Sequence, residues 1–173
     1  CSSLSSIVIP SSVAMIEEAS FMNCSKLEKV EIDEKSELKT IQKNAFRNCT
    51  SLTSFVLPSK CSFVGPSCFM DCTKLTSFKY EGSDLSSINC RTFFNCSSLA
   101  KIKFAHLTSK SYRSLGDDEE DDDNKYCEEE DENEFYVFNI NDEAFMNCSS
   151  LKEVVFEDNK KVTKLKTAFI YPP

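Results

Sequence analysis

Apolar and polar positions recur along this chain in a unit of about 24 residues. Each unit contains Phe-x-[Asn/Asp]-Cys-[Ser/Thr]-x-Leu, and successive motif cysteines from Cys1 to Cys148 lie 23, 25, 23, 24 and then 52 residues apart. A fixed period of this length is typical of solenoids, in which each unit buries its apolar face against its neighbours. The motif residues are Phe21/Cys24/Leu27, Phe46/Cys49/Leu52, Phe69/Cys72/Leu75, Phe93/Cys96/Leu99 and Phe145/Cys148/Leu151, preceded by Cys1 and Leu4.

After each motif Leu, the order x-x-apolar-x-apolar predicts a short strand, because alternate side chains of a strand point to the same face. Equivalent strands of successive coils should lie side by side in parallel, roughly 4.7–4.9 Å apart. The inward pairs are Ile7/Ile9, Val30/Ile32, Phe55/Leu57, Phe78/Tyr80, Ile102/Phe104 and Val154/Phe156. A second apolar pair follows a turn: Val13/Ile16, Leu38/Ile41, Cys61/Val64, Leu85/Ile88 and Val137/Ile140.

The repeats resemble the BspA-type leucine-rich repeats of bacterial surface proteins and some parasitic protists. Residues 44–49 (Asn-Ala-Phe-Arg-Asn-Cys) and 49–58 (Cys-Thr-Ser-Leu-Thr-Ser-Phe-Val-Leu-Pro) carry the resemblance, which covers all but about residues 105–134. Departures are Asp71 in place of Asn, Phe94 at the variable position and Phe169 without a following Cys. The resemblance implies a leucine-rich-repeat solenoid: an α/β-type right-handed superhelix, rich in short parallel strands, one per repeat. It also implies an adhesive or protein-binding role.

Residues 1–173 are therefore expected to form a single solenoid domain. The chain has no initiating Met, signal-peptide pattern or polar capping repeat, so we expect it to be part of a longer array. No apolar run reaches the roughly 18 residues that a membrane span requires, and no span is expected in this chain. The pattern does not specify an oligomeric state.

An acidic insertion at residues 105–134 interrupts the repeats. Residues 117–134 hold thirteen acidic residues and one Lys, a net charge of −12; subtracting this from −8 for the chain leaves +4 for the rest. Three interpretations stay open: a disordered solvated loop, an electrostatic contact with a basic partner or the solenoid's own lysines, and calcium binding, which the absence of Gly in the segment disfavours. The candidate electrostatic residues are Asp117, Asp118, Glu119, Glu120, Asp121, Asp122, Asp123, Glu128, Glu129 and Glu130.

Ten cysteines ordinarily suggest a disulfide framework, but their register favours buried thiols. Six occupy the same motif position, and Cys61 and Cys68 fall on apolar core positions. Only Cys90 and Cys127 lie outside this pattern, so these two are expected to react first. Zinc is disfavoured because one ligand per coil cannot converge on a tetrahedron. The motif asparagines also match glycosylation acceptors, although a role in satisfying the turn is favoured: Asn23, Asn48, Asn95 and Asn147.

No pattern in the sequence predicts a catalytic, cofactor or metal site. His106 is the only histidine, and Gly65, Gly82 and Gly116 are too far apart to form a phosphate loop. Basic residues form no dense stripe, which disfavours nucleic-acid binding.

The outward positions of the strands form the candidate binding face. Its residues are Val8, Lys29, Glu31, Val56, Lys79, Lys101, Lys103, Glu153 and Val155. The resulting hypothesis is a non-catalytic protein-binding or adhesion module, on the cell surface or secreted, with a host or extracellular-matrix protein as candidate partner. The alternative is a cytoplasmic scaffold or interaction protein.

Overall fold

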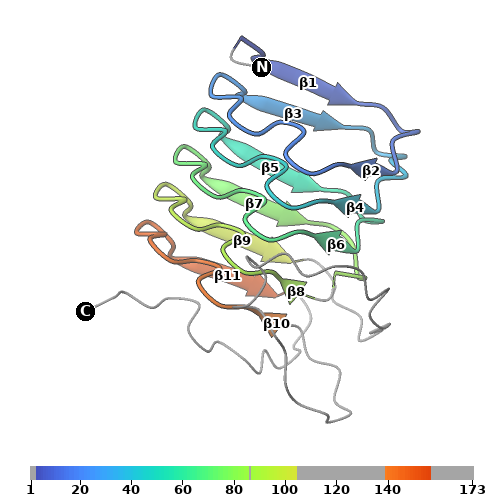
Figure 1. The fold of residues 1–173 in the computed structure, drawn as a ribbon. Helices are drawn as coiled ribbons and strands as arrows, with labels where there is room; N and C mark the ends of the chain where they lie inside the picture. The colour runs from blue at the N-terminus through green and yellow to red at the C-terminus, as the bar shows by residue number, and fades with distance from the viewer. Residues whose placement is uncertain (1–2, 86, 105–138, 157–173) are drawn as a thin grey trace, which may run out of the picture.

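The alternation after each motif Leu forms a four-residue strand in every repeat of the computed structural model, which describes residues 3–85, 87–104 and 139–156. These long strands are β1 (Ser6–Ile9), β3 (Lys29–Ile32), β5 (Ser54–Leu57), β7 (Ser77–Tyr80), β9 (Lys101–Phe104) and β11 (Glu153–Phe156). They pair in parallel as a two-stranded sheet, β1–β3, and a four-stranded sheet, β5–β7–β9–β11. Figure 1 shows them stacked coil upon coil, which confirms the predicted leucine-rich-repeat-like β-solenoid.

A second row of strands, each of two residues, accompanies the long ones (Figure 1). It comprises β2 (Met15–Ile16), β4 (Thr40–Ile41), β6 (Phe63–Val64), β8 (Ser87–Ile88) and β10 (Asn139–Ile140). Their order is β2–β4–β6 and β8–β10, again in parallel. The second residue of the second apolar pair, such as Ile41 of Leu38/Ile41, lies at the end of one of these short strands. Each described repeat therefore has two strands, whereas the sequence predicted one. The described ranges contain strands and turns and no helix.

The motif Phe lies in a turn that hydrogen-bonds to the next coil. The Phe21 N–H donates to the Ala45 carbonyl at 2.8 Å, and the Phe46 N–H donates to the Cys68 carbonyl at 2.9 Å. The turn needs a left-handed backbone two residues before and two residues after the Phe, at Ala19, Asn44, Ser67, Arg91 and Glu143 and at Asn23, Asn48, Asp71, Asn95 and Asn147. Asn and Asp tolerate positive φ better than other non-glycine residues, which explains the motif's [Asn/Asp] position.

Phenylalanine rings form a continuous column through the core. Phe21, Phe46, Phe69, Phe93 and Phe145 stack with centroids 5.1, 5.5, 5.6 and 5.7 Å apart and with nearly parallel planes. Phe55 and Phe78, from β5 and β7, insert edge-on between rings of this column. Edge-to-face and offset aromatic pairs add stabilisation beyond the buried area, so this column is the main source of inter-coil cohesion.

The coils on either side of the acidic insertion pack directly against each other. β9 pairs with β11 in register, and the Phe93 N–H donates to the Ala144 carbonyl at 2.9 Å. The stack of coils is therefore continuous across the insertion. Residues 105–138, which include His106, Cys127, Val137 and every candidate acidic residue, lie outside the described residues, as do Cys1 and Phe169.

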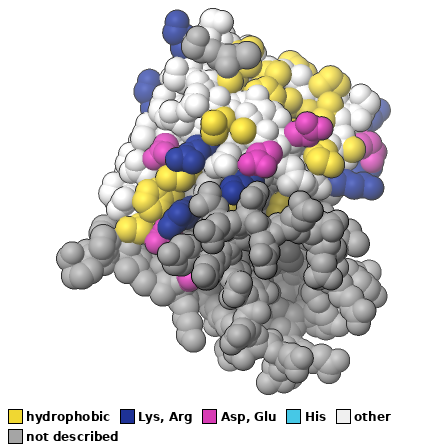
Figure 2. Space-filling view, in the orientation of Figure 1, with side chains coloured by type: hydrophobic (Ala, Val, Ile, Leu, Met, Phe, Trp, Pro, Cys, Tyr) yellow, Lys and Arg dark blue, Asp and Glu magenta, His cyan; other side chains and the backbone are white. Residues whose placement is uncertain are grey.

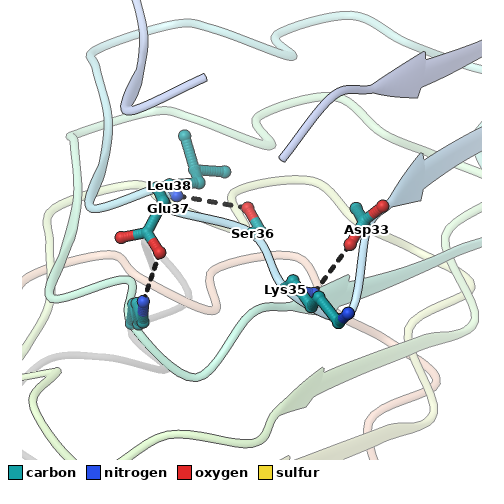
Figure 3. A network of polar contacts seen from close by, with 6 residues as sticks. Asp33, Lys35, Ser36, Glu37 and Leu38 are labelled. Atoms are coloured by element: carbon teal, nitrogen blue, oxygen red, sulfur yellow. Dashed lines mark hydrogen bonds and ion pairs between the residues drawn. The ribbon is translucent and has the colours of Figure 1, made fainter. Parts of the chain in front are cut away.

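The interval from Cys24 to Cys49 is 25 residues, two more than the intervals on either side of it. The additional residues lie in the connection between β3 and β4 (Figure 3). There the Lys35 N–H donates to the Asp33 carboxylate at 2.7 Å, and the Leu38 N–H donates to the buried Ser36 hydroxyl at 3.1 Å. Glu37 forms an ion pair with Lys60 of the next coil at 2.5 Å, and this hydrogen bond and charge lower the pKa of Glu37. Side-chain hydrogen bonds and an ion pair thus hold this longer connection between β3 and β4 in place.

Tyr80 holds the loop after β7 through its hydroxyl. This oxygen accepts the N–H groups of Asp84 at 2.9 Å and Leu85 at 3.0 Å, and burial raises the Tyr80 pKa to about 12. Gly82 lies in the same loop, where an added Cβ would come within 2.0 Å of the Ser59 carbonyl oxygen. The close approach explains Gly at this position.

We expect Tyr80→Phe to lower the free energy of unfolding by about 1–3 kcal/mol, because it leaves two backbone N–H groups without their acceptor. Urea denaturation followed by circular dichroism measures this loss. A change below about 0.5 kcal/mol would mean that water replaces the hydroxyl at no cost.

Candidate protein-binding surface

The strand register places the predicted face residues in two columns that run across the coils. Lys29 lies opposite Ser6, and Lys101 lies between Ser77 and Glu153. The second column contains Val8 opposite Glu31, Val56 opposite Lys79, and Lys103 between Lys79 and Val155. Long-strand pairing is interrupted between β3 and β5, where the Thr53 N–H to Glu28 carbonyl bond lengthens to 3.4 Å.

Two valines are the apolar features of this face. Val8 is 63% exposed and Val56 is 48% exposed, although both side chains belong to strands. Val155, in the same column, is half-buried. Figure 2 shows one face of the stack, on which apolar side chains are interspersed with basic and acidic ones. Single exposed apolar side chains are common on protein surfaces, so these two positions make the face a candidate contact surface.

Acidic side chains accompany lysines of the face. Lys29 pairs with Glu31 at 2.5 Å, Lys101 pairs with Glu153 at 2.9 Å, and Lys79 pairs with Glu81. Exposed pairs of this kind stabilise the fold by at most about 1 kcal/mol each, but they cancel charge locally. The positive charge of these three lysines is therefore largely neutralised.

These ion pairs are the site feature that sequence reasoning missed. The signal was present, because Lys29 and Glu31 are two residues apart on the same face of one strand. Lys101 and Glu153 occupy the same repeat position in adjacent strands, where opposite charges interact.

The motif cysteines form a ladder of buried thiols. The Sγ atoms of Cys49, Cys72, Cys96 and Cys148 each lie 3.0–3.2 Å from the carbonyl oxygen of the motif Phe in the preceding coil. Burial raises the pKa of Cys49 and Cys148 to about 12. Each thiol therefore stays protonated and donates to a carbonyl, a specific role for Cys that the sequence interpretation of a small apolar residue did not include.

Cys90 corrects one prediction. The sequence placed it outside the core, as an early-reacting thiol, but it is only 7% exposed and is disulfide-bonded. Cys90 lies two residues after the end of β8, at a position that the repeat pattern does not mark as apolar. The free cysteines of the described ranges are Cys24, Cys49, Cys61, Cys68, Cys72, Cys96 and Cys148, all buried.

The motif asparagines also connect adjacent coils. The Asn48 Nδ2 donates to the Asn23 Oδ1 at 2.9 Å, and the Asn95 Nδ2 donates to the Asp71 Oδ1 at 2.9 Å. The sequence predicted a structural role through backbone groups of the turn, whereas these bonds join side chains of adjacent coils. Asn48 and Asn95 thus use the nitrogen that glycosylation would modify.

We expect Asn48→Ala to lower the free energy of unfolding by about 1–2 kcal/mol, through loss of a hydrogen bond and through the cost of a left-handed Ala. Asn48 has φ 59°, so Asn48→Gly is the matched control: it loses the same bond without that steric cost. Thermal melts of both variants separate the two effects. Equal losses in Ala and Gly would indicate that backbone conformation contributes little here.

Within the described ranges, no group of three His, Cys, Asp or Glu side chains is placed to hold a metal ion. A search of the same ranges also found no helix long and apolar enough to cross a bilayer.

The model of a protein family described as "BspA type Leucine rich repeat region" matches residues 1–115 and 132–171 of this chain, in six copies. A leucine-rich repeat protein from Eubacterium ventriosum superposes on 89% of this chain and 33% of its own, with TM-score 0.65 and 18% identity. Pneumococcal vaccine antigen PcpA superposes on 58% of this chain and 27% of its own, with TM-score 0.53 and 30% identity. A leucine-rich cell surface protein from Faecalibacterium prausnitzii covers 88% and 41%, with TM-score 0.50 and 18% identity. No curated protein matches the chain.

Proposed function

Because the chain belongs to the BspA-type leucine-rich repeat family, we propose that it is a non-catalytic protein-binding or adhesion module. The contact surface is the outward face of the long strands, and the observation that carries the proposal is the exposure of Val8 and Val56 at the same position of β1 and β5. The lysines around them have acidic partners, so apolar burial supplies affinity and the ion pairs supply specificity.

A cell-surface or secreted location belongs to the same proposal. Support comes from the similar proteins, of which one is described as a cell surface protein and another as a vaccine antigen. The chain spans about a third or less of the first two matched structures, so a longer protein of this type would present the module as one segment of an array.

The test uses the 173-residue chain and immobilised fibronectin, laminin and collagen as probes. We expect saturable binding to at least one probe, and at least a tenfold loss of affinity in the double variant Val8→Glu/Val56→Glu. Phe63→Glu is the matched control, because Phe63 is 39% exposed on β6 and is not part of the proposed face. Absence of binding to all three probes, or equal losses in both variants, would contradict the proposal.

An intracellular scaffold is the second candidate: the free thiols of the described ranges suit a reducing compartment, whereas the disulfide at Cys90 suits an oxidising one. Surface labelling of intact cells with a membrane-impermeant biotin reagent distinguishes the two. Labelling of the protein before lysis supports display outside the cell, whereas labelling only after lysis supports the scaffold.

A further inference from the structure

The residue that directly follows each motif Phe forms a second, separate stripe along the solenoid. Its members are Met22, Arg47, Met70, Phe94 and Met146, called here the methionine stripe. Adjacent members are held in register by the backbone. The carbonyls of Arg47, Met70, Phe94 and Met146 each accept an N–H from the preceding coil at 2.8–2.9 Å. The five positions therefore follow one another at the inter-coil spacing.

This stripe lies across the core from the long-strand face. Phe46 points into the core from the turn and meets the Phe55 ring, which points inward from β5, with centroids 5.2 Å apart. Since the two elements approach the core from opposite sides, the outer surface of the turn and the outer surface of β5 are different surfaces of the solenoid. The stripe is thus independent of the face proposed above.

Four of its five members are apolar although all retain contact with solvent. Met22 is 38% exposed, and Met70, Phe94 and Met146 are half-buried. The repeat does not require an apolar residue directly after the motif Phe, because this position is variable in the repeat pattern. Methionine is flexible and polarizable, and it adapts to the shape of a partner better than a branched side chain does.

Arg47 gives the stripe a single charge. It lies between Met22 and Met70, and no carboxylate of the described ranges forms an ion pair with it. A guanidinium among apolar neighbours is best complemented by a carboxylate that can accept two of its hydrogen bonds. The charge pattern of a matching ligand is therefore apolar, acidic, apolar, apolar, apolar.

We propose that the methionine stripe binds an amphipathic helix of another protein, aligned with the solenoid axis and carrying one carboxylate opposite Arg47. Four intervals of roughly 4.8 Å give a stripe of about 19 Å. A helix rises 5.4 Å per turn, so five side chains on one face, one per turn, extend over about 22 Å and about 15 residues, close to the length of the stripe. An extended peptide would cover the same length with alternate side chains facing away.

The probe is a fluorescein-labelled, capped 16-residue helical peptide with leucine at positions 1, 8, 12 and 15 and glutamate at position 5. A second peptide carries the same pattern in the reverse chain direction. Fluorescence anisotropy against the 173-residue chain should show saturable binding by one of them. Arg47→Glu and Met70→Ser should each weaken it at least tenfold, and replacing the peptide glutamate by lysine should restore binding to Arg47→Glu. Val56→Glu, on the other face, should leave affinity within twofold.

Several outcomes would overturn the proposal. These are failure of both peptides to saturate, binding that Arg47→Glu leaves unchanged, and equal losses in Val56→Glu. Self-association that Met70→Ser abolishes in analytical ultracentrifugation would instead assign the stripe to a second copy of this chain. Co-sedimentation with vesicles of phosphatidylserine, lost in the same variant, would assign it to a lipid surface. A cooperative thermal melt of each variant confirms that it is folded.

Discussion

Raising the pH from 8 to 10 is expected to remove a large part of the stability of the solenoid. Six buried thiols have a raised pKa: Cys49, Cys61 and Cys148 at about 12, and Cys68, Cys72 and Cys96 well above the ordinary value, in every case mainly through burial. The unfolded chain releases these protons near pH 9, whereas the folded chain keeps them. Stability is therefore complete below about pH 9 and is lost as the pH rises toward 12.

The size of this effect follows from proton linkage. At pH 10 each such thiol lowers the free energy of unfolding by about 1 kcal/mol, so the six together lower it by several kcal/mol, a large part of the stability of a typical domain. Urea denaturation at pH 7.5, 9 and 10, with a phosphine reductant to prevent thiol oxidation, measures the slope.

Cys72→Ala serves as the control. It removes one of the six thiols, so the fall in stability with pH should become shallower by about one sixth, even though the variant starts from a lower value. Stability that stays constant between pH 8 and 10 would show that the ladder thiols are accessible to solvent or already oxidised.

Most of the fold follows from the period of the sequence. A repeat with Phe, Cys and Leu at fixed positions can bury all three side chains by stacking successive coils on one another. The alternation of apolar and polar residues identifies the inward side of each long strand. The short strands were missed because a pair such as Leu38/Ile41 has no period of two. The left-handed backbone at Ala19 and Ser67 was also missed, since neither residue type signals it and stacking alone imposes it.

The candidate surface was predictable only in outline. Alternation identified the outward positions, including Val8 and Val56, because register in a parallel stack is fixed by the repeat. It did not identify the partner of Lys101, which comes from a strand 52 residues further along the chain. The burial of Cys90 was not predicted either, because the repeat pattern does not mark its position as apolar.

Phe69→Ala is expected to lower the free energy of unfolding by about 3–5 kcal/mol, the usual cost of removing a fully buried ring. Phe69 is fully buried at the centre of the ring column. It stacks on Phe46 and Phe93 at 5.5 and 5.6 Å and meets the edges of two rings from β5 and β7. No other described ring has more of these contacts, so the cavity cannot be closed by one neighbour moving.

The matched control is Phe63→Ala, because Phe63 is 39% exposed on β6 and its loss should change stability by no more than about 0.5 kcal/mol. Urea denaturation gives both values. The shape of the Phe69→Ala transition carries further information, since coils of a solenoid contact only their neighbours. A broadened transition would mean that the cavity separates the stack into two halves that unfold independently, whereas a sharp but shifted one would mean that the remaining ladders still couple them. A loss as small as that of Phe63→Ala would show that the motif Phe does not hold the coils together.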